Sequence, residues 1–394
     1  MKAQMERWEW LPLLGLVASV FIFNTSEFMP IGLLVDIADD FGISEAKAGM
    51  LITAYAWAVT ILSLPLMILA SRFEYKRLLM GTVLLFGVGQ ILSAVAGGYW
   101  MLMFARLLVA CAHSVFWSIA TPLAVRIVAK SHGAAALGMI VTGTSLAIIC
   151  GLPLGRVVGL YVGWRITFGL LGAAALLVLV YIGCIFPRVD SDEPFSLKEL
   201  PGLLKNPMLT GLYLLTFIHV TGYYTGYSYI EPFLQQVAHM TDGWITAMLV
   251  VLGVAGIIGS MLFSRMFNTH PTGFLRTAVL VAALSLFMLR PGAVSNYTML
   301  AVCIIWGIAV TAFNVAGNAE IIRAVPFHAS AVATAIFSGI FNLGIGTGTW
   351  VGGMVTTYLS IGDIGFVGGV FGLIAAAYCA FVLSRHLNAI GGKL

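Results

Sequence analysis

The sequence predicts an all-α integral membrane protein with twelve transmembrane helices in two pseudo-symmetric six-helix bundles. Of its 394 residues, 60% are hydrophobic and only 9% are charged, and the mean hydropathy is +1.01. A soluble domain carries about 25% charged residues, so this chain cannot cover a water-facing surface and must be solvated by a lipid bilayer. The net charge of +4 is small, and no nucleic-acid partner is expected.

A single long polar stretch divides the chain into two apolar halves of similar length. It runs from Pro187 to Pro207 and carries seven charged residues. We expect an N-terminal six-helix bundle over residues 1–186, a cytoplasmic linker over 187–207 and a C-terminal six-helix bundle over 208–394. A linker between two equal apolar halves is typical of a duplicated bundle.

Each half contains six segments that are long enough to cross a bilayer. A spanning helix needs about 20 mostly apolar residues. Dividing the chain at Gly, Pro and charge clusters places the twelve spans at residues 10–35, 45–70, 77–97, 99–125, 134–159, 164–186, 208–237, 243–267, 273–290, 296–323, 329–358 and 363–387.

The Lys and Arg residues predict how the spans are oriented. If both termini are cytoplasmic, fifteen of the 20 Lys and Arg residues fall in inner segments. Only Lys47, Arg165 and Arg290 then fall in outer ones. Cytoplasmic loops carry an excess of positive charge, so we expect both termini and the linker to be inside. The N-terminal apolar run lacks a small-residue cleavage site and is interpreted as a first span.

The two halves resemble one another weakly. Glu27 and Pro30 lie in the first span, and Glu231 and Pro232 lie at the matching place in the seventh. The fifth and eleventh spans are both rich in Gly, which lets helices approach closely. Repeats related in this way place a binding site near the bilayer midplane, between the halves.

Charged side chains inside spans are costly and usually mark function. Glu27 is expected in the outer half of the membrane, and Arg106 of the fourth span at a similar depth. They could exchange a proton as the bundle moves, or form a permanent structural ion pair; both interpretations stay open. Glu231 is the second candidate for proton handling. Glu320, three residues before Arg323, is predicted to form a structural pair.

The seventh span contains an unusual density of hydroxyl groups in the stretch GYYTGYSYIEPF (222–233). Tyr224 is three residues from Tyr227 and four from Ser228, so one polar stripe can face a cavity. Aromatic faces with hydroxyl groups suit a polyol such as a sugar. The alternative is an aromatic belt at the outer interface, which fits Tyr229 better than Tyr224.

Polar and aromatic residues in other spans are further candidates for ligand contacts. A buried Asn or His more often forms a hydrogen bond between helices than a contact with a ligand. Several such residues are nevertheless predicted near the middle of the membrane. The candidates besides Tyr224 and Tyr227 are Asn24, His113, Trp117, Asn314, Asn318 and Asn342. The five cysteines have no metal-ligand spacing, so no metal site is expected.

Several stretches match motifs of a known family. They are NTSEFMPIGLL (24–34) with DIADDFGIS (36–44), GLPLGRVVG (151–159), GWRITF (163–168) and YSYIEPF (227–233). With Arg106, they make the whole chain resemble the twelve-span drug:H⁺ antiporter group of the major facilitator superfamily. That group includes bacterial sugar efflux transporters and arabinose efflux permeases, and YSYIEPF resembles the signature of the sugar efflux subset. DIADDFGIS is expected to be an outer loop.

The resemblance implies a monomeric transporter of the bacterial inner membrane, not an enzyme. It would export sugars or sugar-like molecules, of the arabinose or thiogalactoside type, by alternating access. A proton gradient would supply the energy without a cofactor, with Arg106 assigned to proton transfer. The loop between the second and third spans departs from the family pattern, with Ser71 at the usual Asp and Glu74 near the usual Gly. The gating residues carried over are Arg72, Lys76, Arg77, Gly151, Pro153 and Gly155.

Three alternatives are weighed against sugar export. The nearest alternative is a proton antiporter of the same fold that exports drugs or nucleosides. A second is a membrane sensor that does not transport, but such a protein would be expected to carry a large soluble domain. An intramembrane enzyme is disfavoured, because no metal-spaced His/Glu set and no Ser-His pair at helical spacing is present.

Overall fold

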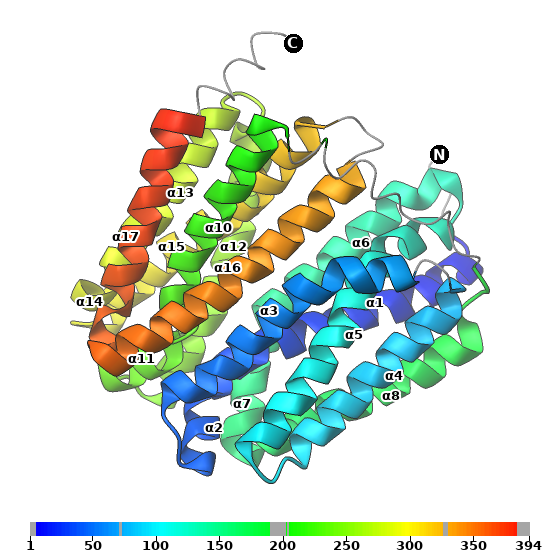
Figure 1. Cartoon of the computed structure of the whole chain (residues 1–394), viewed down its shortest axis with the longest axis horizontal. Coiled ribbons are helices and arrows are strands. Elements are labelled where there is room, and N and C mark those ends of the chain that lie inside the picture. Colours follow the sequence, from blue (N-terminus) through cyan, green and yellow to red (C-terminus); the bar gives the residue numbers. More distant parts are fainter. Residues whose placement is uncertain (1–4, 71–72, 190–201, 203–204, 326–329, 384–394) are drawn as a thin grey trace. The chain divides into compact units, whose positions relative to one another are not determined.

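The computed structural model describes residues 5–70, 73–189, 202, 205–325 and 330–383, and most of them are helical (Figure 1). The chain divides into two compact units. The first comprises Met1–Gly42 and Ala58–Phe195, and the second comprises Ile43–Trp57 and Ser196–Leu394. Most of the expected linker, 187–207, lies outside the described residues.

The first unit contains the helices before the linker, with the early part of α3 grouped in the second unit. In chain order they are α1 (Arg7–Phe28), the 3₁₀ helix η1 (Met29–Leu33), α2 (Leu34–Phe41), α3 (Glu45–Ala70), α4 (Tyr75–Ala94), α5 (Tyr99–Arg126), a 3₁₀ turn (Lys130–His132), α6 (Gly133–Leu146), the π-helical turn η3 (Ala147–Gly151), α7 (Leu152–Val162) and α8 (Trp164–Ile185).

The second unit contains the helices after the linker. They are α10 (Pro207–Tyr227), α11 (Ile230–Gln236), α12 (Asp242–Met266), α13 (Pro271–Phe287), α14 (Leu289–Gly292), α15 (Asn296–Arg323), α16 (Ser330–Tyr358), a 3₁₀ turn (Ile361–Asp363), α17 (Ile364–Tyr378) and a π-helical turn (Cys379–Leu383).

The predicted spans are confirmed as helices. Within the described residues, 10 helical segments are long and apolar enough to cross a membrane, and α13 is a shorter apolar helix. With α10, they account for the six spans predicted in each half. The seventh span begins where Asn206 accepts hydrogen bonds from the backbone N–H groups of Met208 and Leu209. Such caps satisfy donors that a helix start leaves open.

The prediction of an outer loop over 36–44 is wrong for most of its length. Residues 34–41 form α2, and Gly42 ends that helix in the left-handed region with φ 59°. This is the usual glycine termination of a helix. The family resemblance suggested a loop over these residues, but the chain turns only at Gly42, after α2 ends.

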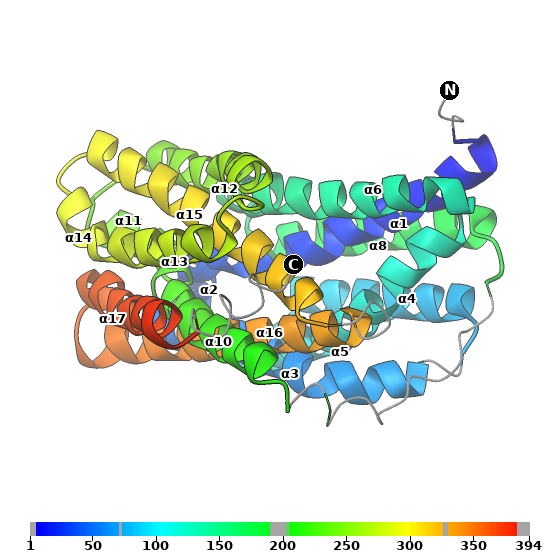
Figure 2. The ribbon, with the colours of Figure 1, turned by 90° about the horizontal axis from the view of Figure 1, so that it is seen from above.

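The helices pack in the same pattern in both units. In the first, α4 packs on α5 and α8, while α1 packs on α6, α7 and α8. In the second, α13 packs on α15 and α17, while α10 packs on α16 and α17 (Figure 2). Equivalent helices therefore have equivalent neighbours, as expected for a duplicated bundle.

Glycines spaced four residues apart allow some of these helices to approach closely. In the first unit they lie at the π-helical turn and on α7, and a Cβ atom on any of them would overlap a side chain of α1 or η1. The facing pairs are Gly151 with Thr25, Gly155 with Met29, and Gly159 with Leu33.

The second unit repeats this arrangement on α16. Here an added Cβ atom would overlap α10, and at Gly348 and Gly352 it would meet backbone carbonyl oxygens rather than movable side chains. The facing pairs are Gly344 with Val220, Gly348 with Thr221, and Gly352 with Thr225. The glycines of the fifth and eleventh spans thus pack each span onto the first helix of its own half.

Gly352→Ala should destabilise the protein, whereas Gly339→Ala on the same helix should not. At Gly352 the new Cβ would lie 2.6 Å from the Thr225 carbonyl oxygen, while at Gly339 it meets no atom within 4 Å. Overpacking costs about 1–3 kcal/mol, and Ala is better than Gly in an open helix position by about 0.5–1 kcal/mol. The melting temperatures of both purified variants test this. Equal shifts would contradict the packing account.

Candidate functional site

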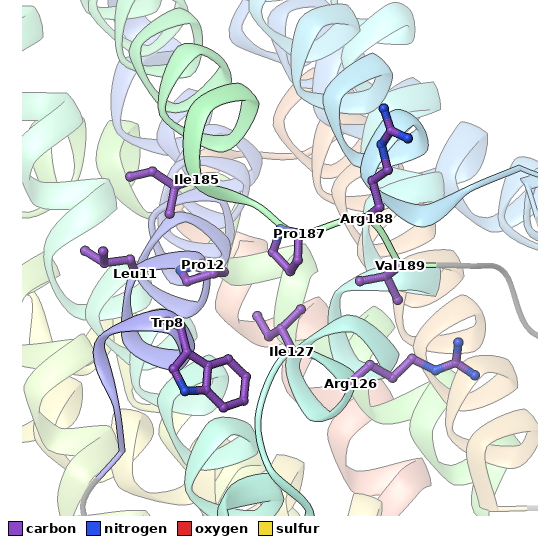
Figure 3. Close-up of a pocket in the computed structure, with 9 residues that line it drawn as sticks. All are labelled: Trp8, Leu11, Pro12, Arg126, Ile127, Ile185, Pro187, Arg188 and Val189. Carbon is purple, nitrogen blue, oxygen red and sulfur yellow. The ribbon is translucent and has the colours of Figure 1, made fainter.

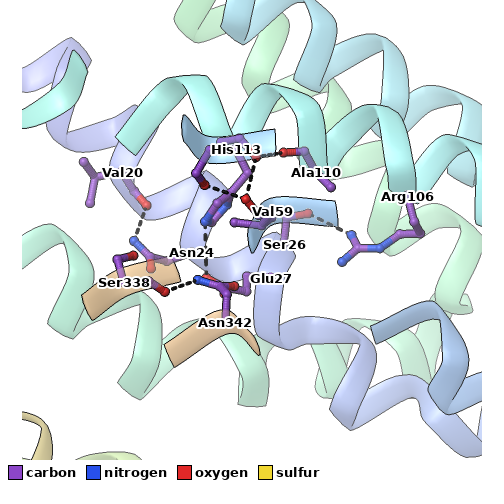
Figure 4. A network of polar contacts seen from close by, with 12 residues as sticks. Val20, Asn24, Ser26, Glu27, Val59, Arg106, Ala110, His113, Ser338 and Asn342 are labelled. Carbon is purple, nitrogen blue, oxygen red and sulfur yellow. Dashed lines mark hydrogen bonds and ion pairs between the residues drawn. The ribbon is translucent and has the colours of Figure 1, made fainter. Parts of the chain in front are cut away.

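The first unit contains a buried ionisable cluster at the last turn of α1 (Figure 4). Glu27 Oε2 lies 3.7 Å from His113 Nε2 on α5, and these side chains are only 10% and 3% exposed. A charge in such a place is costly unless it is paired or neutralised. Two predicted site residues, one assigned to the proton and one to the substrate, are therefore in contact.

Arg106 lies in the same cluster and is almost fully buried. Its Nη1 atom donates a hydrogen bond of 3.1 Å to the hydroxyl of Ser26, and Gln90 of α4 donates to that same oxygen. The guanidinium also interacts electrostatically with Glu27 and His113. Arg106 and Glu27 thus belong to one cluster, in which Arg106 bonds to Ser26 and the direct contact of the carboxylate is with His113.

The cluster is positioned by a helix break and by stacked rings. α1 ends at Phe28, and Pro30 lies at the start of η1. One turn before Glu27, the Phe23 ring stacks between Phe86 of α4 and Phe116 of α5, at centroid distances of 4.1 and 4.2 Å. These contacts fix α1 against α4 and α5.

Two further predicted substrate contacts lie on the helices that form this cluster, Asn24 on α1 and Trp117 on α5. Asn24 donates a hydrogen bond of 2.9 Å from Nδ2 to the Val20 carbonyl of its own helix. Trp117 is partly exposed, and its ring centroid lies 6.2 Å from that of His113. The imidazole is therefore beside both a carboxylate and an indole.

The second unit contains a cluster of four aromatic rings on α10 and α15. The rings of Tyr223 and Tyr227 are stacked at 4.9 Å, and Tyr224 packs edge-on against both. Trp306 of α15 lies 5.3 Å from Tyr223 and 6.0 Å from Tyr227. The predicted pair Tyr224 and Tyr227 thus belongs to a larger aromatic group on α10 and α15.

The seventh span breaks immediately after these tyrosines. α10 ends at Tyr227 and α11 begins at Ile230, with the Ser228 hydroxyl 2.6 Å from the Thr349 hydroxyl of α16. Glu231 is in the first turn of α11 and is 2% exposed. Tyr229 is fully buried, so the aromatic-belt interpretation is wrong for it; its ring packs against Gly352.

The three predicted asparagines of the second unit are at least partly buried. Asn314 and Asn318 are one turn apart on α15. Asn342 donates from Nδ2 to the Ser338 carbonyl at 3.1 Å (Figure 4). The Oδ1 atoms of Asn318 and Asn342 are buried and have no hydrogen-bond partner among the described residues. Such acceptors are available to a ligand that donates hydrogen bonds.

The predicted gating residues after the second span differ in their contacts and in their exposure to solvent. Lys76 donates from Nζ to the carbonyls of Gly183 and Phe186, at 3.1 and 2.6 Å, and so caps the end of α8. Arg77 is 82% exposed on its side chain and pairs with Glu74 at 3.1 Å. Arg72 lies outside the described residues. Of the fifth-span candidates, Pro153 follows the π-helical turn at the start of α7.

Sequence reasoning missed three residues around the candidates. They are Gln90, which donates to the Ser26 hydroxyl beside Arg106, Trp306 among the tyrosines, and Thr349 beside Ser228. An amide inside an apolar span is a usable signal, so Gln90 was accessible to such reasoning. Trp306 lies in an apolar stretch of α15 and carries no comparable signal.

Comparisons with known proteins agree with this architecture. The family model of the Major Facilitator Superfamily matches residues 16–349. A bacterial homolog of the human lysosomal transporter Spinster, crystallised in an inward-facing and unoccupied conformation, is similar with a TM-score of 0.80 at 16% identity, covering 97% of this chain and 98% of that one. A mutant of the peptide transporter POT, crystallised in complex with alafosfalin, has a TM-score of 0.75 at 14% identity, covering 95% and 94%.

The family match covers most of the chain, and the similarity of fold extends over nearly all of it. The twelve helices, the repeated packing and these matches lead to one conclusion. The chain belongs to the major facilitator superfamily and is a membrane transporter of small molecules, not an enzyme.

Proposed function

We propose that this transporter exports sugars or sugar-like small molecules in exchange for protons, by alternating access. It would work as a monomer in a bacterial inner membrane, with both termini cytoplasmic, and would draw its energy from the proton gradient without a cofactor. The observation that carries the proposal is the buried contact between Glu27 and His113 beside Arg106.

The ionisable cluster supports proton coupling through its charge balance. Arg106 keeps its charge at any working pH, whereas the carboxyl of Glu27 and the imidazole of His113 can each gain or lose a proton. Protonating Glu27 removes its attraction to the guanidinium, so the net charge of the buried cluster changes by one. Intramembrane acid and histidine groups serve in this way as proton relays. Glu231, buried at the break of the seventh span, is the second candidate.

The second unit supports a sugar as the cargo. The ring of Tyr227, which is partly exposed and packs on Tyr224 and Trp306, offers a flat apolar face that suits the C–H surfaces of a sugar. Tyr224 is the second proposed contact on this helix. The Oδ1 atoms of Asn318 and Asn342 offer acceptors for its hydroxyl groups. Asn24, His113, Trp117 and Asn314 are the remaining proposed substrate contacts.

A nucleoside or drug antiporter of the same fold is the second candidate function. The stacked rings of Tyr223 and Tyr227 would also accept a flat base or an aromatic drug. The two buried amide acceptors favour a cargo with several hydroxyl groups, and this leads us to place sugars first.

In inverted membrane vesicles that hold an imposed proton gradient, a transported sugar should collapse the gradient. Glu27→Gln should abolish this collapse while leaving sugar binding largely intact, because the amide keeps the shape of the side chain but cannot release a proton. Arabinose, a thiogalactoside, a nucleoside and chloramphenicol would be added in turn.

The matched control is Glu320→Gln. Glu320 is also a buried acid but pairs with Arg323 of its own helix at 3.6 Å, so this variant should keep the collapse. A response only to the nucleoside or chloramphenicol would replace the sugar with that cargo. Sugar-driven collapse that survives in Glu27→Gln would remove Glu27 from the coupling.

Tyr227→Ala should raise the KM for the exported sugar at least tenfold, since about 1.4 kcal/mol of lost stacking corresponds to a factor of ten. Tyr227→Phe keeps the ring and should have a smaller effect. Tyr297→Ala provides the control, because Tyr297 is 75% exposed and packs on Trp244, which is not part of the aromatic group. Transport kinetics in the same vesicles measure all three. An unchanged KM in Tyr227→Ala would exclude the ring from the substrate site.

A further inference from the structure

Gln90 is a buried amide to which the proposed transport mechanism gives no role. It lies on α4 and is fully buried, and its Nε2 atom donates a hydrogen bond to the Ser26 hydroxyl of α1. Its Oε1 atom is buried without a hydrogen-bond partner among the described residues. A buried polar atom without a partner is costly, so stability alone does not explain an amide at this place.

The Ser26 hydroxyl connects Gln90 to Arg106. The Nη1 atom of Arg106 donates a hydrogen bond of 3.1 Å to the same oxygen (Figure 4). A hydroxyl oxygen has two acceptor lone pairs, and these two donors occupy both. Ser26 is itself fully buried. The guanidinium is therefore bonded to a hydroxyl that an amide from another helix also holds.

The amide and the guanidinium are both held from the side of α8. A Cβ atom added to Gly172 of α8 would lie 3.3 Å from the Cβ atom of Gln90, so α4 and α8 pack closely at this point. The Cζ atom of Arg106 lies 5.8 Å from the centroid of the Phe168 ring, also on α8. Close packing of this kind fixes side-chain positions.

The position of this guanidinium matters because Ser26 is the neighbour of Glu27 in the chain. Arg106 acts electrostatically on the Glu27 carboxyl group, whose Oε2 atom lies 3.7 Å from His113. A positive charge favours an ionised carboxylate, and the effect grows as the distance falls. The place at which the guanidinium is held therefore decides how readily Glu27 takes up a proton.

We propose that Gln90 is a positioning residue for proton coupling, which acts through Ser26 to commit an N–H group of Arg106 to the hydroxyl instead of the Glu27 carboxyl group. The inference rests on the proposed function, because it takes Glu27 as the group that carries the proton. It adds the residue that sets the pH range in which Glu27 is loaded.

The charged groups that act on Glu27 come from α5. The α6 helix and the turn η3, which pack on α1, contain no charged residue. On α7, the Cβ atom of Arg156 packs beside Gly32 of η1, beyond the break of the first span. On α8, Arg165 pairs with Asp40 of α2 at 2.6 Å. The guanidinium and the imidazole of the ionisable cluster are therefore the groups that the test must consider.

The remaining charge of α5 lies at the end of that helix. Arg126 is its last residue, and the guanidinium lies 5.4 Å from the centroid of the Tyr75 ring. Arg126 lines a pocket of about 330 Å³ where the start of α1 and the ends of α5 and α8 meet (Figure 3). No residue of the ionisable cluster lines this pocket, so the two places are separate.

The test follows the protonation of Glu27 by infrared spectroscopy of the purified full-length protein in bilayers, without sugar. The band of its protonated carboxyl group is identified by its absence in Glu27→Gln. In Ser26→Ala, Arg106 loses its acceptor and the Glu27 carboxylate becomes the alternative. The pH at which half of the band is lost should therefore fall by about one unit or more. Ser26→Thr keeps the hydroxyl and should keep the midpoint of the unmodified protein.

Gln90→Glu should shift this midpoint in the opposite direction. The substitution keeps the shape of the side chain and adds a negative charge, which attracts Arg106 and repels the Glu27 carboxylate. Ser19→Ala is the matched control, because Ser19 is a buried serine of the same helix whose hydroxyl donates to the Gly15 carbonyl of that helix at 2.8 Å. It should leave the midpoint unchanged.

The inference would be overturned by an unchanged midpoint in Ser26→Ala, or by shifts of the same sign in Ser26→Ala and Gln90→Glu. The absence of any band that depends on Glu27 would overturn it as well. Because the titration is made without sugar, its result is distinct from that of the vesicle experiment. The expected shifts, together with no collapse of the gradient by sugar, would reject sugar export and leave the role of Gln90 in place.

Discussion

The interior of a bilayer supplies no hydrogen-bond partners for the backbone, and this constraint shapes the whole chain. Spanning segments must satisfy their own backbone groups, so breaks are tolerated only where protein surrounds them. The first span breaks after Phe28, where the glycine-lined face of α7 packs closely on it. The seventh breaks at Ser228, which is held by a hydrogen bond to Thr349 of α16.

The candidate proton-handling acids stand at these two breaks. Glu27 is in the last turn before one break and Glu231 in the first turn after the other. In each unit the broken first helix rests on a helix whose glycines are spaced four residues apart. Both units therefore share one packing arrangement, in which an interrupted first helix packs against a helix whose contact face is lined by glycines. The chemistry around it has diverged, with an ionisable cluster in the first unit and stacked rings in the second.

Much of the fold follows from the sequence because its signals are local. The spans could be placed from runs of apolar residues, and the Glu320–Arg323 pair from a spacing of three residues on one helix. Contacts between helices could not be placed in the same way. Glu27 was paired with Arg106 by depth alone, but depth does not fix the rotation of α1 about its axis. The structure shows that this rotation directs Ser26 to Arg106 and Glu27 to His113.

The central claim is that Glu27 carries the proton exchanged for the substrate. The most direct measurement is proton release when the transported sugar is added to the purified protein in a weakly buffered solution. The account predicts that binding releases protons from the unmodified protein and releases none from Glu27→Gln, although both bind sugar. Binding that releases no proton from the unmodified protein, or equal release from both proteins, would contradict it.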